Sequence, residues 1–219
     1  MSISEKLQQI VKTLPPGVTL VAVSKTKSED DIMKAYTAGQ RVFGENKVQE
    51  LVGKWEVLPK DIQWHMIGHL QRNKVKYIAG FVTLIHGVDS LRLLREINKR
   101  AAQADRIQDC LLQVHIASES TKFGFDQAEI AEAMEIIKAK QLPNIRVRGL
   151  MGMATFTEDQ AQVRGEFRFL KSLFDALGKG DETFNILSMG MSGDYLLAIE
   201  EGSTMVRLGS SIFGSRNTP

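Results

Sequence analysis

The 219-residue sequence predicts a single (β/α)8 barrel, in which eight parallel strands close into a cylinder surrounded by helices. Short apolar runs alternate with longer segments of helical period along the whole chain, and this alternation is typical of a parallel sheet. The runs are continuously apolar, as strands covered on both faces should be. Eight strands favour a closed barrel over an open, doubly wound sheet, although barrels usually have about 200 to 400 residues and this chain is near the lower end.

The predicted strands follow one another at similar intervals. An additional helix over 4–13 is expected before the first strand. No proline-rich linker, low-complexity tract or break in composition interrupts the alternation, so we expect one domain over residues 1–219. The eight predicted strands are 19–24, 41–43, 63–67, 82–86, 111–116, 146–151, 184–188 and 205–208.

Two of the helices between the strands begin with recognisable capping residues. Ser28 is expected to be the N-cap of the first, with Asp31 at its third position. Asp89 is expected to cap a helix over 90–104. The apolar residues that this second helix turns toward the sheet are Leu91, Leu94 and Ile97.

Three later helices are also expected. Asp126 and Glu129 open one of them, and a long helix follows Thr157. A shorter helix is expected over 195–199. The inward-facing residues of the first two are Ile130, Met134 and Ile137, and then Val163, Phe167, Leu170 and Phe174.

Charge and composition exclude several classes of function. The 28 basic and 26 acidic side chains leave a net charge of +2, which argues against a nucleic-acid-binding surface. The basic run over 72–76 is interpreted as a solvated helix face. The N-terminus lacks the apolar core of a signal peptide, and no apolar stretch approaches the length of a membrane span, so we expect a soluble, cytoplasmic protein.

The single cysteine, Cys110, lies in an apolar run and is expected to be a buried, inert thiol.

Functional residues of a (β/α) barrel lie where strands end and in the loops that follow. The first strand ends at Lys25, with Lys27 close by. Burial and a neighbouring positive charge both lower an amine pKa, which favours the neutral nucleophile that forms a Schiff base. The structural alternative is a lysine that extends into water at the end of a strand.

The loops after the seventh and eighth strands are rich in glycine and serine. The seventh strand continues through SMGMSGD at 188–194, and the eighth through RLGSS at 207–211. Small residues at a helix start leave backbone N–H groups pointing outward, which suits a phosphate group, and these two loops are where barrels most often bind phosphate. Either loop alone could simply turn the chain. Together with the lysine, they indicate a phosphorylated aldehyde or ketone as ligand.

Two further stretches are less specific. The polar segment GENKVQE at 44–50 could reach a ligand, or it could simply begin a helix. His65 and His69 would share one face of a strand, but no nearby carboxylate or cysteine completes a metal site. We therefore expect a packed His65, a His69 that faces the barrel mouth, and no metal.

Six segments together resemble the family of pyridoxal phosphate homeostasis proteins, which are similar to the N-terminal barrel of alanine racemase. The resemblance covers nearly the whole chain in the same order, and it implies a TIM barrel that binds pyridoxal 5′-phosphate. The matching segments are AVSKTK at 22–27, GEN at 44–46, WHMIGHLQRNK at 64–74, GLM at 149–151, SMGMSGD at 188–194 and VRLG at 206–209.

The resemblance also implies roles for individual residues. Lys25 would hold the cofactor as a Schiff base, Asn46 would lie near its ring, and Arg207 would face the pyridine nitrogen. A positive guanidinium there discourages protonation of the ring nitrogen and weakens the cofactor as an electron sink. Lys122 resembles a second lysine of the family with a role in cofactor handling. The phosphate would be held by Ser192, Gly193, Gly209 and Ser210.

Two main functions are compatible with this site. A carrier would buffer pyridoxal phosphate and deliver it through transient contacts with dependent enzymes, as a monomer. An amino-acid racemase or lyase would need a second acid/base group opposite Lys25, which two-domain racemases take from a tyrosine of the second domain. The sequence ends shortly after the eighth strand, and Tyr36, Tyr77 and Tyr195 are poorly placed for that role, so we expect a carrier without robust catalysis. A class I aldolase that uses Lys25 without a cofactor is a third alternative, and the resemblance argues against it.

Overall fold

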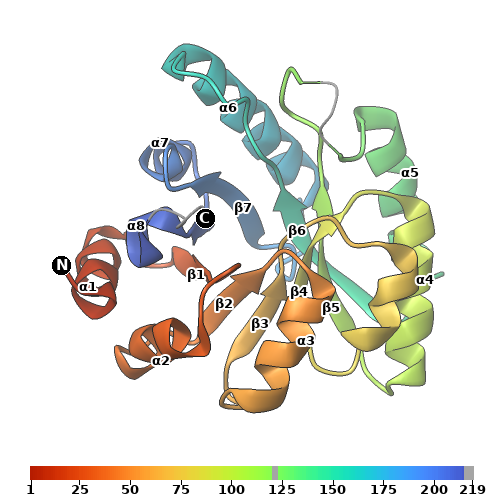
Figure 1. Cartoon of the computed structure of the whole chain (residues 1–219). Helices are drawn as coiled ribbons and strands as arrows, with labels where there is room; N and C mark the ends of the chain where they lie inside the picture. Colours follow the sequence, from red (N-terminus) through yellow and green to blue (C-terminus); the bar gives the residue numbers. More distant parts are fainter. Residues whose placement is uncertain (120–122, 215–219) are drawn as a thin grey trace.

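The computed structural model is a closed barrel of eight parallel strands, each paired with its neighbours in chain order and the last paired with the first. It describes residues 1–119 and 123–214. Figure 1 shows the strands at the centre with helices around them. The strands are β1 Thr19–Val23, β2 Val42–Glu45, β3 Gln63–Met66, β4 Leu84–Val88, β5 Gln108–Gln113, β6 Ile145–Met151, β7 Ile186–Met191 and β8 Met205–Leu208.

The helices cover the outside of this cylinder. Helix α1 precedes the first strand, as predicted, and packs against α2 and α8 on one side of the molecule (Figure 1). Among the described residues, no helix has both the length and the apolarity that crossing a membrane requires. The helices are α1 Ile3–Thr13, α2 Glu29–Thr37, α3 Val48–Val57, α4 Leu91–Gln103, α5 Gln127–Lys138, α6 Gln160–Leu177, α7 Tyr195–Glu200 and α8 Ser210–Phe213, with a 3-10 helix η1 Arg72–Tyr77.

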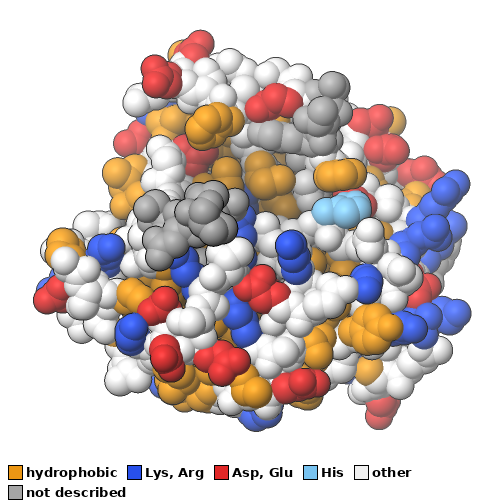
Figure 2. All heavy atoms as spheres, in the orientation of Figure 1, with side chains coloured by type: hydrophobic (Ala, Val, Ile, Leu, Met, Phe, Trp, Pro, Cys, Tyr) orange, Lys and Arg blue, Asp and Glu red, His pale blue; other side chains and the backbone are white. Residues whose placement is uncertain are grey.

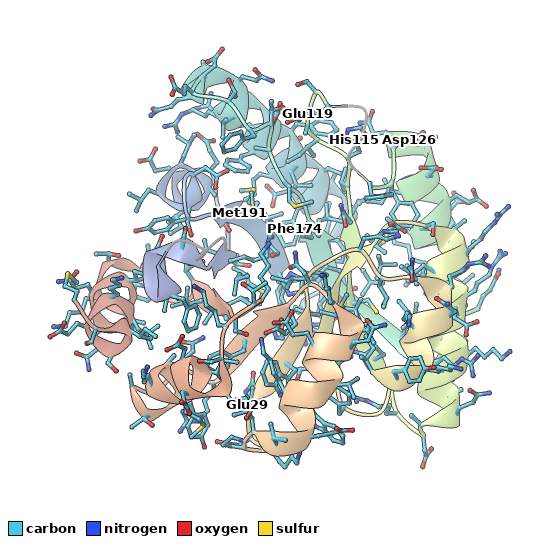
Figure 3. All side chains as sticks on the ribbon, in the orientation of Figure 1. Glu29, His115, Glu119, Asp126, Phe174 and Met191 are labelled. Atoms are coloured by element: carbon cyan, nitrogen blue, oxygen red, sulfur yellow. The ribbon has the colours of Figure 1, made fainter. Side chains whose placement is uncertain are left out.

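Local capping explains several of the helix starts. The Ser28 side chain accepts a hydrogen bond from the Asp31 N–H, as predicted. At α5 the Asp126 carboxylate accepts from the backbone N–H of Glu129, whose own carboxylate accepts from the Asp126 N–H. Asp126 lies at the start of α5 in Figure 3. Polar side chains that satisfy the first N–H groups therefore set these boundaries.

One predicted cap was wrong. Helix α4 is capped by Ser90, whose hydroxyl accepts from the Leu93 N–H, while Asp89 pairs with His69 instead. Helix α6 follows Thr157, as predicted, and is capped by Asp159. The inner face of α4 consists of Leu93, Leu94, Ile97 and Ala101, so Leu91, at the first position, is only partly buried.

The fifth strand also differs from its predicted bounds of 111–116. It begins at Gln108, a polar residue that is nevertheless fully buried, because its side-chain amide donates to the carbonyls of Thr83 and Asp109. Cys110 is in this strand and is buried, as predicted, and burial raises the pKa of its thiol.

Side chains fill the interior of the barrel in layers. Val21, Leu84, Leu111, Met151 and Met205 form an apolar cluster with one residue from each of five strands, which can meet only inside the cylinder. Two larger apolar clusters lie between the strands and the surrounding helices. The barrel is therefore a packed core, and its site lies at one end of it.

Candidate functional site

A cavity of about 550 Å3 lies at the carboxyl end of the strands. Lys25 and Asn46 follow β1 and β2, and Arg207 lies on β8. Figure 2 shows basic side chains near the centre of this face, beside an apolar hollow. The seven residues predicted to hold the cofactor all line this one cavity: Lys25, Asn46, Ser192, Gly193, Arg207, Gly209 and Ser210.

The loops after β7 and β8 form one wall of the cavity. They are joined by a hydrogen bond of 3.3 Å that the Gly209 N–H donates to the Ser192 hydroxyl. Asp194 and Gly209 are the N-caps of α7 and α8, and neither helix start has a side-chain cap. The first-turn N–H groups of both helices therefore lie beside Ser192 and Ser210 without a capping carboxylate or hydroxyl.

Apolar side chains also line the cavity. Ile67, Met153 and Phe156 line it together with Met191, which Figure 3 labels at the end of β7. Phe156 is almost completely exposed. A ligand in this cavity would therefore contact hydroxyl and backbone groups as well as apolar side chains.

Arg207 is buried at the floor of the cavity. Its Nη1 donates to the Ser188 carbonyl at 2.9 Å and to the Ser188 hydroxyl at 2.6 Å, and its Nη2 donates to the Gly152 carbonyl at 3.1 Å. Burial lowers the pKa of this guanidinium to about 10, so it stays charged at neutral pH. The three hydrogen bonds hold its plane in one orientation.

A chain of hydrogen bonds continues from Arg207 into the barrel. The Ser188 hydroxyl lies 3.1 Å from Nδ1 of His86, and Nε2 of His86 lies 3.0 Å from Nδ1 of His65. Because a guanidinium only donates, Ser188 accepts from Arg207 and donates to His86, which must then carry its proton on Nε2 and donate to His65. Burial lowers the pKa of His65 to about 3 and that of His86 well below its ordinary value, so both rings are neutral.

Among the described residues, His65 and His69 do not belong to a metal site. His65 is packed, as predicted, and the half-exposed His69 lies 2.9 Å from Asp89 and stacks on Phe123. Within 1–119 and 123–214, no group of three or more His, Cys, Asp or Glu side chains could hold a metal ion. A more open hollow of about 650 Å3 beside η1 and α4 is lined by Arg72, Asp89, Arg92 and Glu96, and no predicted site residue is part of it.

Sequence reasoning missed the positions of two carboxylates in the segment at 44–50. Glu45 and Glu50 bind Lys54 of α3, with Nζ–Oε1 distances of 2.8 Å and 2.7 Å, rather than the cavity. The spacing of Glu50 and Lys54, four residues apart on a helix, is a signal that could have identified this pair. Lys122 lies outside the described residues.

The three tyrosines do not belong to the described lining of the cavity. The Tyr36 hydroxyl donates to Asp61, Tyr77 is half-exposed on η1, and Tyr195 is partly buried at the start of α7. None of them is among the described residues that line the cavity.

The family model described as "Alanine racemase, N-terminal domain" matches residues 1–217. A pyridoxal phosphate homeostasis protein of Aquifex aeolicus is 43% identical over 202 residues, which are 90% of this chain and 86% of that protein. The human protein of the same name is 39% identical over 238 residues, covering 99% of this chain and 85% of its own length.

Solved structures agree with these sequence matches. PipY of Synechococcus elongatus with pyridoxal phosphate bound has a TM-score of 0.87 and 36% identity, over 97% of this chain and 100% of that chain. Alanine racemase from Bartonella henselae has a TM-score of 0.74 with 16% identity, over 99% of this chain and 61% of that chain. The second likeness is one of fold.

Proposed function

Because the chain belongs to the family of pyridoxal phosphate homeostasis proteins, we propose that it binds pyridoxal 5′-phosphate as a Schiff base on Lys25 and takes part in pyridoxal phosphate homeostasis. The observation that carries the proposal is the convergence of seven residues, from strands at opposite ends of the sequence, on one cavity. PipY, whose solved structure contains pyridoxal phosphate, supports the choice of ligand.

The donor groups of the cavity fit this ligand. The Ser192 and Ser210 hydroxyls and the starts of α7 and α8 would bind the phosphate, since backbone N–H groups at helix starts favour an anion. Ile67 and Met153 would contact the flat ring, and Asn46 would lie near it. Bound pyridoxal phosphate supplies an aldehyde, which condenses with a lysine amine and releases one water molecule.

Arg207 would face the ring nitrogen and would limit the chemistry of the site. Its guanidinium is charged and can only donate hydrogen bonds, so it opposes protonation of a nitrogen beside it. An unprotonated ring withdraws electrons weakly, which disfavours general carbanion chemistry. This arrangement suits retention and delivery of a cofactor.

A carrier role is also supported by what lines the cavity. Two-base racemisation needs a proton donor or acceptor on each side of the substrate. Among the lining residues that the structure describes there is no tyrosine or histidine. The Asp194 carboxylate accepts from the Met191 N–H, and Lys27 Nζ donates to the carbonyls of Phe213 and Gly214. We therefore propose a carrier without robust catalysis; transient contacts with dependent enzymes, the cytoplasmic location and the monomeric state stay predictions.

The proposal is tested by loading the purified protein with pyridoxal phosphate and reducing it with borohydride. The wild-type protein is expected to become yellow on loading. After reduction, a peptide map should show the cofactor on Lys25. Lys25→Ala should lose the covalent adduct and keep its circular dichroism spectrum, because Lys25 lines the cavity and is not part of the buried core. Lys34→Ala, which removes an exposed lysine of α2, is the control and should load normally.

Colourless wild-type protein after loading would contradict the proposal, and unfolding of Lys25→Ala would contradict the position of Lys25. Chiral analysis of alanine and other amino acids, incubated with the loaded protein, separates carrier from racemase. Turnover at ordinary enzyme rates, about 1 to 1,000 per second, would overturn the carrier role.

A further inference from the structure

Lys25 lies in a tight turn that ends β1. The Lys27 N–H donates to the Ser24 carbonyl at 3.0 Å, so Lys25 and Thr26 occupy the two central positions of a four-residue turn. Thr26, the second of them, has a φ of +63°. A turn with positive φ at this position normally has glycine or asparagine there.

This backbone conformation is unfavourable for threonine. A branched side chain in the left-handed region is rare, because the Cβ atom crowds the neighbouring carbonyl. Strain of this kind persists only where surrounding contacts enforce it, and it is concentrated at functional sites. The contacts around the turn therefore identify what keeps Lys25 in place.

Those contacts come from a cluster formed by Glu45, Glu50 and Lys54 on β2 and α3. The Thr26 N–H donates to Glu50 Oε1 at 2.6 Å, and the Ser24 carbonyl accepts from Lys54 Nζ at 2.9 Å. The Ser24 hydroxyl donates to Glu45 Oε1 at 2.6 Å. One cluster thus holds the peptide on both sides of Lys25.

The cluster is itself buried and internally paired. Glu45 is completely buried, and only 8% of the Lys54 side chain is exposed. Lys54 bridges the two carboxylates, so that neither Glu45 nor Glu50 lacks a cationic partner. Burial raises the pKa of Glu45 even though Lys54 and Ser24 act in the opposite direction, and its Oε2 has no hydrogen-bond partner among the described groups. A buried cluster that leaves a carboxylate oxygen without a hydrogen bond lowers the stability of the fold. A purely stabilising role therefore does not explain this cluster.

We propose that Glu50 and Lys54, with Glu45, are positioning residues that enforce the strained turn at Thr26 and so aim Lys25 into the cavity. The inference rests on the proposed function, because it assigns the cluster an effect on adduct formation by Lys25. None of the three residues is among those that line the cavity. They act through the Ser24 and Thr26 backbone.

The test compares a ligand that can react with Lys25 and one that can only bind in the cavity. Pyridoxine 5′-phosphate carries a hydroxymethyl group in place of the aldehyde, so it uses the phosphate loops and cannot react with Lys25. Glu50→Ala is expected to weaken the adduct with pyridoxal phosphate about tenfold, which corresponds to about 1.4 kcal/mol. Its affinity for pyridoxine 5′-phosphate, measured by calorimetry, should stay within about twofold of wild type, a difference of only a few tenths of a kcal/mol.

Two further variants make the test specific. Glu50→Gln keeps an oxygen that can accept from the Thr26 N–H and should lose less adduct than Glu50→Ala. Thr26→Gly in the Glu50→Ala background should restore adduct formation, because glycine adopts positive φ without strain. Glu96→Ala is the matched control, since Glu96 forms the same four-residue helix pair, with Arg100, at a similar exposure of 22% against 23%.

The outcomes are distinguishable. Failure of wild-type protein to take up pyridoxal phosphate would contradict the proposed function itself. Normal adduct formation by Glu50→Ala, or equal loss of both ligands, would overturn the positioning role. A double variant that stays as weak as Glu50→Ala would show that relief of the turn is not the cause.

Discussion

His65 and His86 are completely enclosed by the barrel, and the fold keeps both rings neutral. Burial lowers the pKa of His65 to about 3 and that of His86 well below 6.5, while the unfolded chain binds protons near pH 6.5. Below pH 6.5 the unfolded state therefore holds more protons than the folded state. The free energy of unfolding must fall as the pH is lowered from 7 toward 3.

Urea unfolding at pH 7.0 and pH 5.5 measures this effect. His65 should lower the free energy of unfolding by about 1 kcal/mol over this interval, and His86 acts in the same direction. His65→Asn removes one of them and should show a fall smaller by that amount than wild type. Between pH 7.5 and 8.5 neither ring titrates in either state, so the two proteins should have the same pH dependence there. Equal slopes below pH 7 would contradict the neutral form of His65.

Among the helices and strands, one glycine is required by the backbone conformation and another is not. Gly149 on β6 has a φ of +147°, and a Cβ atom there would lie 1.9 Å from the Ile186 carbonyl oxygen on β7. Gly165 lies inside α6, where a Cβ atom would meet nothing within 4 Å. Gly149 is therefore required by the pairing of β6 with β7, while Gly165 only lowers the stability of α6.

Alanine substitutions at the two positions should therefore change stability in opposite directions. Gly149→Ala is expected to lose about 3 kcal/mol of unfolding free energy, through overpacking and backbone strain together. Gly165→Ala should gain about 0.5 to 1 kcal/mol, because alanine is the better helix former. Denaturant titration of both variants is the measurement, and a stable Gly149→Ala would show that β6 and β7 are not paired as described.

For the whole molecule, we expect a single chain in solution. Phe156 and Met191 both line the cavity, but other large exposed apolar side chains come from separate elements, as with Val57 at the end of α3, Ile107 before β5 and Phe169 on α6. Scattered apolar residues of this kind are normal for monomers. Light scattering behind a sizing column is expected to give the mass of one chain, 24.4 kDa. Twice that mass at micromolar concentration would contradict the prediction.

The sequence predicted the barrel and the location of the candidate site because both depend on local patterns. Eight apolar runs identified eight strands, and the end of the first strand made Lys25 a candidate, whereas Arg207 was assigned through the family resemblance. The start of the fifth strand was missed because Gln108 is polar yet buried: its side-chain N–H groups donate to the carbonyls of Thr83 and Asp109, while its Oε1 has no partner among the described groups.

The interactions that support the site could not be predicted in the same way. The contacts of Glu45 with Ser24, and of Ser188 with His86, join residues 21 and 102 positions apart. No local pattern connects such pairs, since the curvature of the closed sheet brings them together. Sequence reasoning therefore identified residues that line the cavity and missed those behind them.

The pairing of β1 with β8 has a consequence for the order of events during synthesis. Lys25 leaves the ribosome early, but the cavity that surrounds it also needs Ser192, Arg207 and Gly209, which are translated near the end. A nascent chain that has not yet completed β8 has Lys25 but lacks the cavity around it. Any ligand that needs this cavity would therefore bind only after the first and last strands have met.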